Sequence, residues 1–197
     1  MATLTITQPL TVELPPMSEA EFYEFCRRNE DLRIERTAEG KIIVMAPAYT
    51  ETGGWNRRIT TQLANWADED GRGEAFDSSA GFTLPNGAMR SPDSAWVSYA
   101  RIDSLPEGGM HAFARLCPEF VIELFSSSDS LREVQAKMRE WIENGTELGW
   151  LIDPYQRVVY EYTRDGMRRL DDLSEIPGHG PVEGFTLDLR RIWKRLK

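Results

Sequence analysis

The stretch from Pro118 to Pro154 constrains the fold more than any other part of the chain. Its sequence is PEFVIELFSSSDSLREVQAKMREWIENGTELGWLIDP. A nearly continuous apolar run at 120–125 predicts a strand that is covered on both faces. Apolar residues then recur at the spacing of a helix, at Leu131, Val134, Met138, Trp141 and Ile142. With a second strand predicted at 147–152, the stretch indicates strand, turn, helix, turn, strand.

The predicted helix of this stretch carries a charged residue beside its apolar stripe. Ser130 and Glu133 predict a capping box at its start, and Gly145 is typical of the position just past its end. Lys137 lies roughly 90° from the centre of the stripe, at about 100° per residue. It is one turn from both Val134 and Trp141, so its side chain can lean toward the sheet.

Glu123 lies inside the apolar run of the first strand. An ionised carboxylate in such a place is costly unless a cation, a metal ion or a proton compensates it. A glutamate on a buried strand and a lysine on the next helix are therefore the first candidate site residues.

Composition limits the class of protein. The chain has 197 residues, of which 41% are apolar, and we expect one domain, residues 1–197, with a sizeable core. No apolar run approaches the ~20 residues of a membrane span. The first residues have neither a cationic start nor an apolar block, so we expect no signal peptide. Two cysteines far apart, Cys26 and Cys117, favour a reduced, cytoplasmic setting.

The net charge of −9 disfavours broad, non-specific binding to nucleic acid, because phosphate neutralisation needs clustered Lys and Arg. It does not exclude a local basic strip, and one occurs near the C-terminus at Arg190, Arg191, Lys194, Arg195 and Lys197. The simpler interpretation of that strip is a solvated final helix, from about Leu187 to the end, whose cations suit its C-terminal dipole.

The rest of the chain predicts an α/β fold with a mixed sheet. Residues 1–16 are expected to form an extended arm, followed by a helix that begins at Ser18, with a capping box to Glu21, and runs to about Arg28. Further predicted elements are strands at 32–37 and 41–46 that form a hairpin, a helix at 52–68, strands at 74–77, 81–84 and 94–99, and a hairpin of strands at 157–163 and 167–171.

A second acidic residue, Asp93, begins a predicted strand directly after Pro92. Two acidic side chains on adjacent strands suit a hard divalent cation such as Mg²⁺ or Mn²⁺. The metal would lower the pKa of a bound water and hold a phosphate. A nearby lysine can position or deprotonate that water, or neutralise charge in the transition state. Asp93, Glu123 and Lys137 therefore favour phosphodiester hydrolysis.

Each of these residues also has a simpler interpretation. An Asp after Pro is usually a turn or cap residue, and a Lys on an amphipathic helix is usually solvated. For Glu123 the competitor is a structural salt bridge to an arginine such as Arg90 or Arg139.

The order of several short segments resembles a known family. These segments are Ile34-Glu35 with Gly40 and Met45-Ala46-Pro47, Arg90-Ser91-Pro92-Asp93-Ser94-Ala95-Trp96-Val97-Ser98, Pro118 to Leu124 with Ser126, Lys137, Gly145, and Trp150-Leu151-Ile152-Asp153-Pro154. In this order, over residues 32–153, the chain is similar to the Uma-two family of restriction-endonuclease-like proteins, within the PD-(D/E)XK nuclease superfamily.

The resemblance implies a restriction-endonuclease-like fold with an N-terminal helix and hairpin, and a metal-dependent endonuclease acting on DNA. Pro92-Asp93 would be the PD of the motif and Glu123 its second acid, both ligands of Mg²⁺ or Mn²⁺. In the usual motif the lysine stands two residues later, where this chain has Phe125. In this family the following helix supplies it, which fits Lys137.

Three departures from the family pattern concern the substrate groove rather than the acids. Trp141 stands where tyrosine is usual, Gly149 replaces an aromatic residue, and the helix after Pro47 lacks a histidine often found near its start. Glu35 matches a frequent family acid, and a salt bridge within the hairpin is the favoured interpretation.

Two other functions remain open at this stage. A non-catalytic module for protein or nucleic-acid binding would keep the fold, and the acidic net charge favours it. A two-carboxylate glycosidase would leave Lys137 without a role. The hairpin at 157–171 could supply a paired edge in a homodimer.

Overall fold

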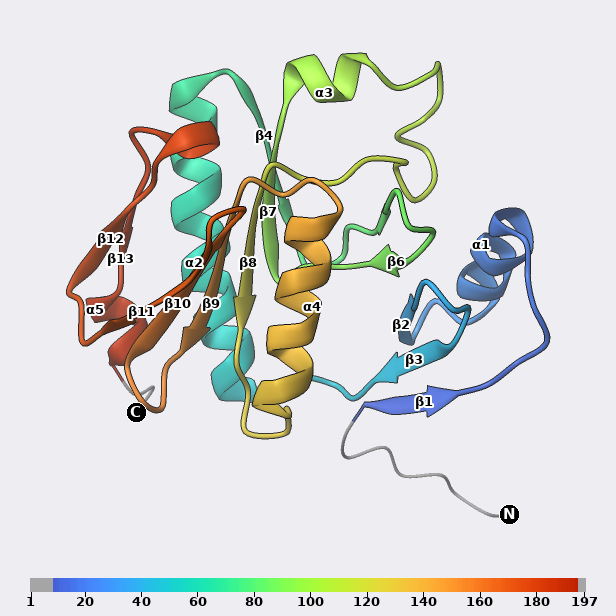
Figure 1. Cartoon of the computed structure of the whole chain (residues 1–197), viewed down its shortest axis with the longest axis horizontal. Helices are drawn as coiled ribbons and strands as arrows, with labels where there is room; N and C mark the ends of the chain where they lie inside the picture. The colour runs from blue at the N-terminus through green and yellow to red at the C-terminus, as the bar shows by residue number, and fades with distance from the viewer. Residues whose placement is uncertain (1–8, 195–197) are drawn as a thin grey trace.

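The computed structural model, which describes residues 9–194, is a mixed α/β fold built on two main β-sheets (Figure 1). This confirms the predicted fold class. The larger sheet has six strands in the order β11 (Gly166–Asp171), β10 (Val158–Thr163), β9 (Leu148–Asp153), β8 (Phe120–Leu124), β7 (Ser94–Ser98) and β4 (Gly73–Asp77). The smaller sheet has five strands in the order β1 (Leu10–Val12), β3 (Ile42–Met45), β2 (Arg33–Arg36), β6 (Met89–Arg90) and β5 (Phe82–Thr83).

Two helices cover opposite faces of the larger sheet (Figure 1). Helix α2 (Thr50–Asp70) lies on one face, and α4 (Leu131–Glu143), which connects the parallel strands β8 and β9, lies on the other. Successive side chains of a strand point to opposite faces. On β8, Phe120, Ile122 and Leu124 pack with the α2 side of the core and Val121 packs with the α4 side. Glu123 therefore points toward α4.

The smaller sheet stands beside the larger one and carries helix α1 (Glu19–Arg28) (Figure 1). Its core is small and includes Phe22 of α1 and Ile34 and Ile42 of the predicted β2–β3 hairpin. Within the predicted arm, residues 10–12 form β1, which pairs with β3, whereas residues 1–8 lie outside the described residues. Helix α3 (Tyr99–Asp103) follows β7 directly. Within residues 9–194, no helix is long and apolar enough to cross a membrane.

The C-terminal segment differs from the prediction of one long helix from Leu187. It forms a two-stranded sheet of β12 (Glu175–Pro177) and β13 (Thr186–Asp188), a short 3-10 helix (Gly180–Val182) and the short helix α5 (Arg190–Trp193). Leu187, in β13, and Leu189, at the start of α5, are both fully buried in the core beside α2. Residues 195–197 of the predicted basic strip lie outside the described part of the chain.

One of the two predicted capping boxes is present. Ser18 and Glu21 exchange hydrogen bonds at the start of α1, with the Ser18 N–H 2.8 Å from the Glu21 carboxylate. The box predicted for Ser130 and Glu133 is wrong, because no side chain caps α4. There the backbone amides of Glu133 and Val134 instead bond to the Ser130 carbonyl, both at 3.0 Å.

Candidate active site

Asp93 is held at the end of the larger sheet by two hydrogen bonds. The register that pairs Ser94 with Ile122 places Asp93 next to Glu123 on the neighbouring strand. Its Oδ1 accepts a hydrogen bond from Asn56 Nδ2 of α2 at 3.0 Å, and its Oδ2 accepts one from the Leu124 N–H at 2.9 Å. Both bonds fix the carboxylate rather than expose it as a surface turn residue.

Glu123 is almost fully buried, with 5% of its surface exposed. Its Oε1 lies 2.9 Å from Lys137 Nζ and accepts a hydrogen bond from Trp141 Nε1, also at 2.9 Å. The cationic partner of Glu123 is thus Lys137. The alternative interpretation, a structural salt bridge from Glu123 to Arg90 or Arg139, is wrong. Arg90 pairs with Glu35 and Glu140 instead.

Lys137 reaches from α4 to the sheet and makes three polar contacts. Its Nζ lies 2.9 Å from Glu123 and 2.9 Å from Glu35 Oε1, and it donates to the Ser91 carbonyl at 2.9 Å. Burial alone would lower the pKa of Lys137, but the attraction of Glu123 and Glu35 outweighs burial and raises it above its ordinary value. Lys137 is therefore protonated at neutral pH.

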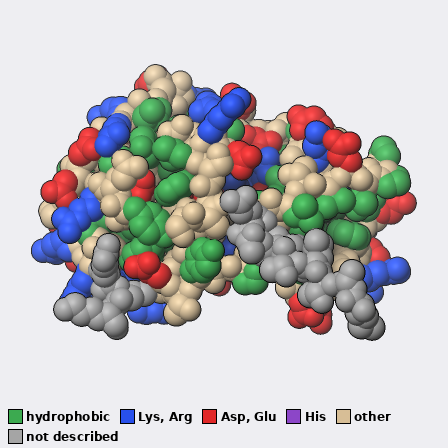
Figure 2. Space-filling model, turned by 90° about the horizontal axis from the view of Figure 1, so that it is seen from below, with side chains coloured by type: hydrophobic (Ala, Val, Ile, Leu, Met, Phe, Trp, Pro, Cys, Tyr) green, Lys and Arg blue, Asp and Glu red, His purple; other side chains and the backbone are tan. Residues whose placement is uncertain are grey.

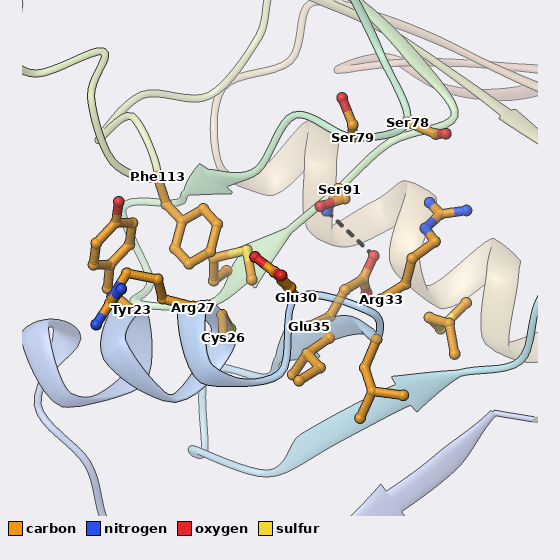
Figure 3. Close-up of a pocket in the computed structure, with 14 residues that line it drawn as sticks. Tyr23, Cys26, Arg27, Glu30, Arg33, Glu35, Ser78, Ser79, Ser91 and Phe113 are labelled. Atoms are coloured by element: carbon orange, nitrogen blue, oxygen red, sulfur yellow. Dashed lines mark hydrogen bonds between the residues drawn. The ribbon is translucent and has the colours of Figure 1, made fainter.

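Glu35 connects the smaller sheet to this cluster. Its Oε1 accepts from Lys137 and from the Ser91 N–H, the latter at 3.2 Å, and its Oε2 pairs with Arg90 at 3.0 Å. Figure 3 shows Glu35 extending from β2 to Ser91. The expected salt bridge within the hairpin is wrong, because the partners of Glu35 lie on α4 and β6. Burial alone would raise the pKa of Glu35, but the positive charges of Lys137 and Arg90 lower it by more than burial raises it. The pKa of Glu35 is therefore below its ordinary value.

The surroundings of Glu123 raise its pKa to about 7. Burial is the largest cause, and the neighbouring charges of Asp93 and Glu35 act in the same direction, while Lys137 opposes them. One lysine therefore does not fully compensate the negative charge gathered here, so the site favours an added cation or a proton.

Asp93, Glu123 and Lys137 line one cavity of about 100 Å³. Two further polar atoms on its wall, Thr52 Oγ1 and Asn56 Oδ1, are buried without a hydrogen-bond partner within residues 9–194. The carboxylates of Asp93 and Glu123 and these two uncharged groups all offer oxygen atoms to the cavity. Oxygen is the ligand atom that Mg²⁺ and Mn²⁺ prefer. The residues present therefore fit a hard divalent cation.

The cavity offers two carboxylates rather than a complete cage. Within the described part of the chain, no group of three or more His, Cys, Asp or Glu side chains is placed to hold a metal ion. Mg²⁺ usually keeps several waters and takes one or two protein carboxylates together with substrate phosphate. Asp93 and Glu123 match that pattern.

Figure 2 views the molecule from the end where β8 stops and α4 begins. Acidic and basic side chains are interspersed between the part built on the larger sheet and the part built on the smaller one. The ion pair between Lys137 of α4 and Glu35 of β2 joins these two parts.

Sequence reasoning missed Asn56 and the contact of Trp141. Thr52, Asn56 and Thr60 recur every four residues along α2, beside the apolar stripe of Trp55, Ile59 and Leu63. This polar line faces the site, since Asn56 bonds to Asp93 and the Thr60 hydroxyl bonds to that of Ser94 at 2.5 Å. The four-residue spacing of these polar residues could have been found in the sequence as a sign that this face of the helix meets the site. The hydrogen bond from Trp141 to Glu123 was not predictable, because an aromatic residue at helical spacing usually belongs to the core alone.

Comparison with known proteins decides the family. The model of the Uma2 family, described as "Putative restriction endonuclease", matches residues 19–190. The chain belongs to the Uma2 family. The predicted resemblance is thus confirmed, and the Uma2 match extends beyond the predicted core of 32–153 at both ends. No curated protein matches the chain significantly.

A solved structure supports the fold of this Uma2 protein. The crystal structure of "a putative nuclease belonging to DUF820 from Anabaena variabilis ATCC 29413" aligns with a TM-score of 0.73 and 21% sequence identity. The alignment covers 90% of this chain and 98% of that one. At this identity the likeness shows the fold. The family itself indicates a nuclease of a class that generally uses divalent metals.

Proposed function

We propose that this Uma2 protein is a metal-dependent endonuclease that hydrolyses phosphodiester bonds of DNA. The observation that carries the proposal is the meeting of Lys137 with Glu123, at 2.9 Å, in the cavity that Asp93 also lines. These residues come from α4, from β8 and from the position just before β7, and the motif of the resembling superfamily requires the same three types of side chain.

Each residue has a distinct role in the proposal. Asp93 and Glu123 would hold Mg²⁺ or Mn²⁺, which supplies an acidified water and neutralises charge on the phosphate when bound. Lys137 keeps its proton, so it acts as a fixed cation that stabilises the transition-state phosphate rather than as a base. Glu35 and the Ser91 carbonyl hold the Lys137 ammonium at that place. Asn56 and the Leu124 amide orient the Asp93 carboxylate.

Cleavage of plasmid and linear DNA in Mg²⁺ and in Mn²⁺ tests this proposal. We expect Asp93→Asn, Glu123→Gln and Lys137→Met each to lower the rate at least about 100-fold. The first two remove a charged ligand of the proposed metal, and the third removes the cation that stabilises the transition-state phosphate. Glu24→Gln, on the exposed face of α1, is the control and should cleave as the wild type does. Equal cleavage by all four variants would identify a contaminating nuclease.

The acidic net charge supports one alternative, a binding module that keeps the nuclease fold without its chemistry. Metal binding separates the two. If Mn²⁺ binds with an affinity that depends on Asp93 and Glu123, the nuclease proposal is favoured. If Mn²⁺ binding is absent, or is the same in the double variant, the module is favoured.

A further inference from the structure

We propose that a groove between β2 and α2 binds the sugar–phosphate backbone of the substrate strand next to the catalytic cavity, with Arg33 and Arg57 contacting its phosphates. This inference rests on the proposed nuclease function and adds a substrate-binding site to it.

The groove continues directly from the catalytic cavity. It has a volume of about 320 Å³ and is bordered by β2, the first half of α2 and the turn after β4. Arg33, Asn56 and Asp93 line both the groove and the 100 Å³ cavity. A phosphodiester strand whose scissile phosphate lies at Asp93 therefore enters the groove without crossing an intervening wall.

The two volumes indicate different contents. A space of about 100 Å³ holds a cation and a few waters, since a buried water needs roughly 10–15 Å³ by the same kind of measure. The larger groove has room for the flanking backbone of the substrate. A nuclease must hold that backbone to keep the scissile bond in line, because orientation supplies a large part of the rate.

Arg33 and Arg57 are suited to phosphate because both are exposed and neither forms an ion pair within residues 9–194. In a chain with net charge −9, other surface arginines such as Arg72 and Arg115 do have carboxylate partners. An arginine guanidinium binds phosphate oxygens in a bidentate manner, and such charge-assisted bonds are stronger than neutral ones.

One carboxylate besides Asp93 lines the groove, that of Asp77, and it is already hydrogen-bonded within its own turn. Asp77 accepts hydrogen bonds from the Ser79 N–H at 2.9 Å and from its hydroxyl at 2.6 Å, and these bonds are the main cause of its lowered pKa. Arg33 adds a smaller effect on that pKa, so its guanidinium lies near the turn after β4. Figure 3 shows Arg33 extending from β2 toward Ser78 of this turn.

The start of α2 adds a second feature that favours an anion. Tyr49 at the N-cap makes no side-chain hydrogen bond to the first-turn amides of this 21-residue helix. Thr52, in the same turn, is 5% exposed, and its Oγ1 has no partner in the described chain although it lines the catalytic cavity. First-turn amides that the N-cap side chain leaves uncapped and the positive end of the helix dipole both attract phosphate.

Fluorescence anisotropy with labelled single-stranded and duplex oligodeoxynucleotides tests the groove. The protein is kept in EDTA, so binding is measured without cleavage. We expect Arg33→Ala and Arg57→Ala each to weaken binding, with about a tenfold loss in the double variant at low salt. Each lost phosphate contact should reduce the slope of log affinity against log salt by about 0.7 for a single strand and about 0.9 for duplex.

Matched variants establish whether a loss of affinity belongs to the groove. Arg164→Ala removes an equally exposed arginine in the turn between β10 and β11, at the far end of the larger sheet from β4, and should leave affinity and slope unchanged. Arg33→Lys and Arg57→Lys keep the charge and should keep most of the slope. Thermal unfolding checks that every variant is folded.

Hydrolysis of the small diester bis(p-nitrophenyl) phosphate in Mn²⁺ separates this inference from the proposed function. This substrate reaches the acids without filling the groove, so its hydrolysis reports on the acids alone. It should be kept in Arg164→Ala, because Arg164 lines neither the groove nor the catalytic cavity. Loss of this activity in Asp93→Asn, with arginine-dependent oligonucleotide binding, supports both proposals. Arginine-dependent binding without hydrolysis supports the groove alone. Binding that is absent in the wild type, or equal in the wild type and the double arginine variant, overturns the groove.

Discussion

At the scale of single residues, Glu123 determines the pH range in which the site can take up a cation. Its pKa is raised to about 7, so it carries a proton over much of the acidic range. A cation that binds there must displace that proton. We therefore expect the Mn²⁺ affinity measured by calorimetry to rise about tenfold per pH unit below pH 7 and to level off above it.

The same measurement in Glu123→Gln provides the control for this pH dependence. Glutamine keeps the shape but neither binds a proton in this range nor offers a charged ligand, so affinity should be low and nearly independent of pH. In the wild type, the heat measured in buffers of different ionisation enthalpy should show about one proton released near pH 6. A wild-type affinity that is flat from pH 5 to pH 8 would contradict the raised pKa.

The site residues that lie close together in the sequence were predictable, whereas the contacts they make with residues far away in the sequence were not. Glu123 and Lys137 belong to one strand–turn–helix stretch, so burial and helical spacing were enough to select them. The Lys137–Glu35 contact joins residues 102 positions apart, and the Arg90–Glu35 pair joins residues 55 apart. The first contact follows from the packing of α4 against the smaller sheet and the second from the pairing of β2 with β6, and local patterns encode neither.

At the scale of elements, the β2–β3 hairpin is tied to the larger sheet by a buried charge. Glu35 is 4% exposed and pairs with Lys137 of α4 and Arg90 of β6. Removing one member of a buried ion cluster leaves its partners uncompensated. We expect Glu35→Gln to lower the free energy of unfolding by about 3 kcal/mol in urea denaturation followed by tryptophan fluorescence.

The comparison for Glu35 is an exposed ion pair of the same kind. Glu24 pairs with Arg27 and Arg28 on the surface of α1, where water and salt screen the charges. Glu24→Gln should therefore leave the denaturation midpoint unchanged. If both variants unfold at the wild-type midpoint, the Glu35 cluster does not hold the two sheets together.

Most elements followed from periodicity, and the exceptions have identifiable causes. Helices α1, α2 and α4 and the central strands have the expected apolar spacing within a few residues. The last helix was overpredicted because Leu187, Leu189 and Ile192 fit a helix about as well as a strand followed by a turn of helix. Their burial against α2 selects the second arrangement. Packing also explains why Gly149 stands where the family pattern has an aromatic residue. A Cβ at this position would lie 2.5 Å from the Met138 side chain of α4.

At the scale of the whole molecule, metal binding and stability are linked. A cation that binds the folded chain at a hundredfold excess over its Kd raises the free energy of unfolding by about 2.7 kcal/mol. For a chain of this length that corresponds to a rise in Tm of about 5–10 °C. We expect this rise for the wild type in Mn²⁺, its reversal by EDTA, and its loss in the Asp93→Asn/Glu123→Gln double variant.

Lys137→Met separates metal binding from catalysis in the same experiment. Removing a cation 2.9 Å from Glu123 leaves more negative charge in the cavity, so the rise in Tm with Mn²⁺ should persist or grow while DNA cleavage is lost. The comparison must use each variant's own metal-free Tm, because an unpaired Glu123 and Glu35 lower stability by themselves. An equal rise in Tm for the wild type and the double acid variant would place the metal elsewhere among the 32 acidic residues of the chain and contradict the site.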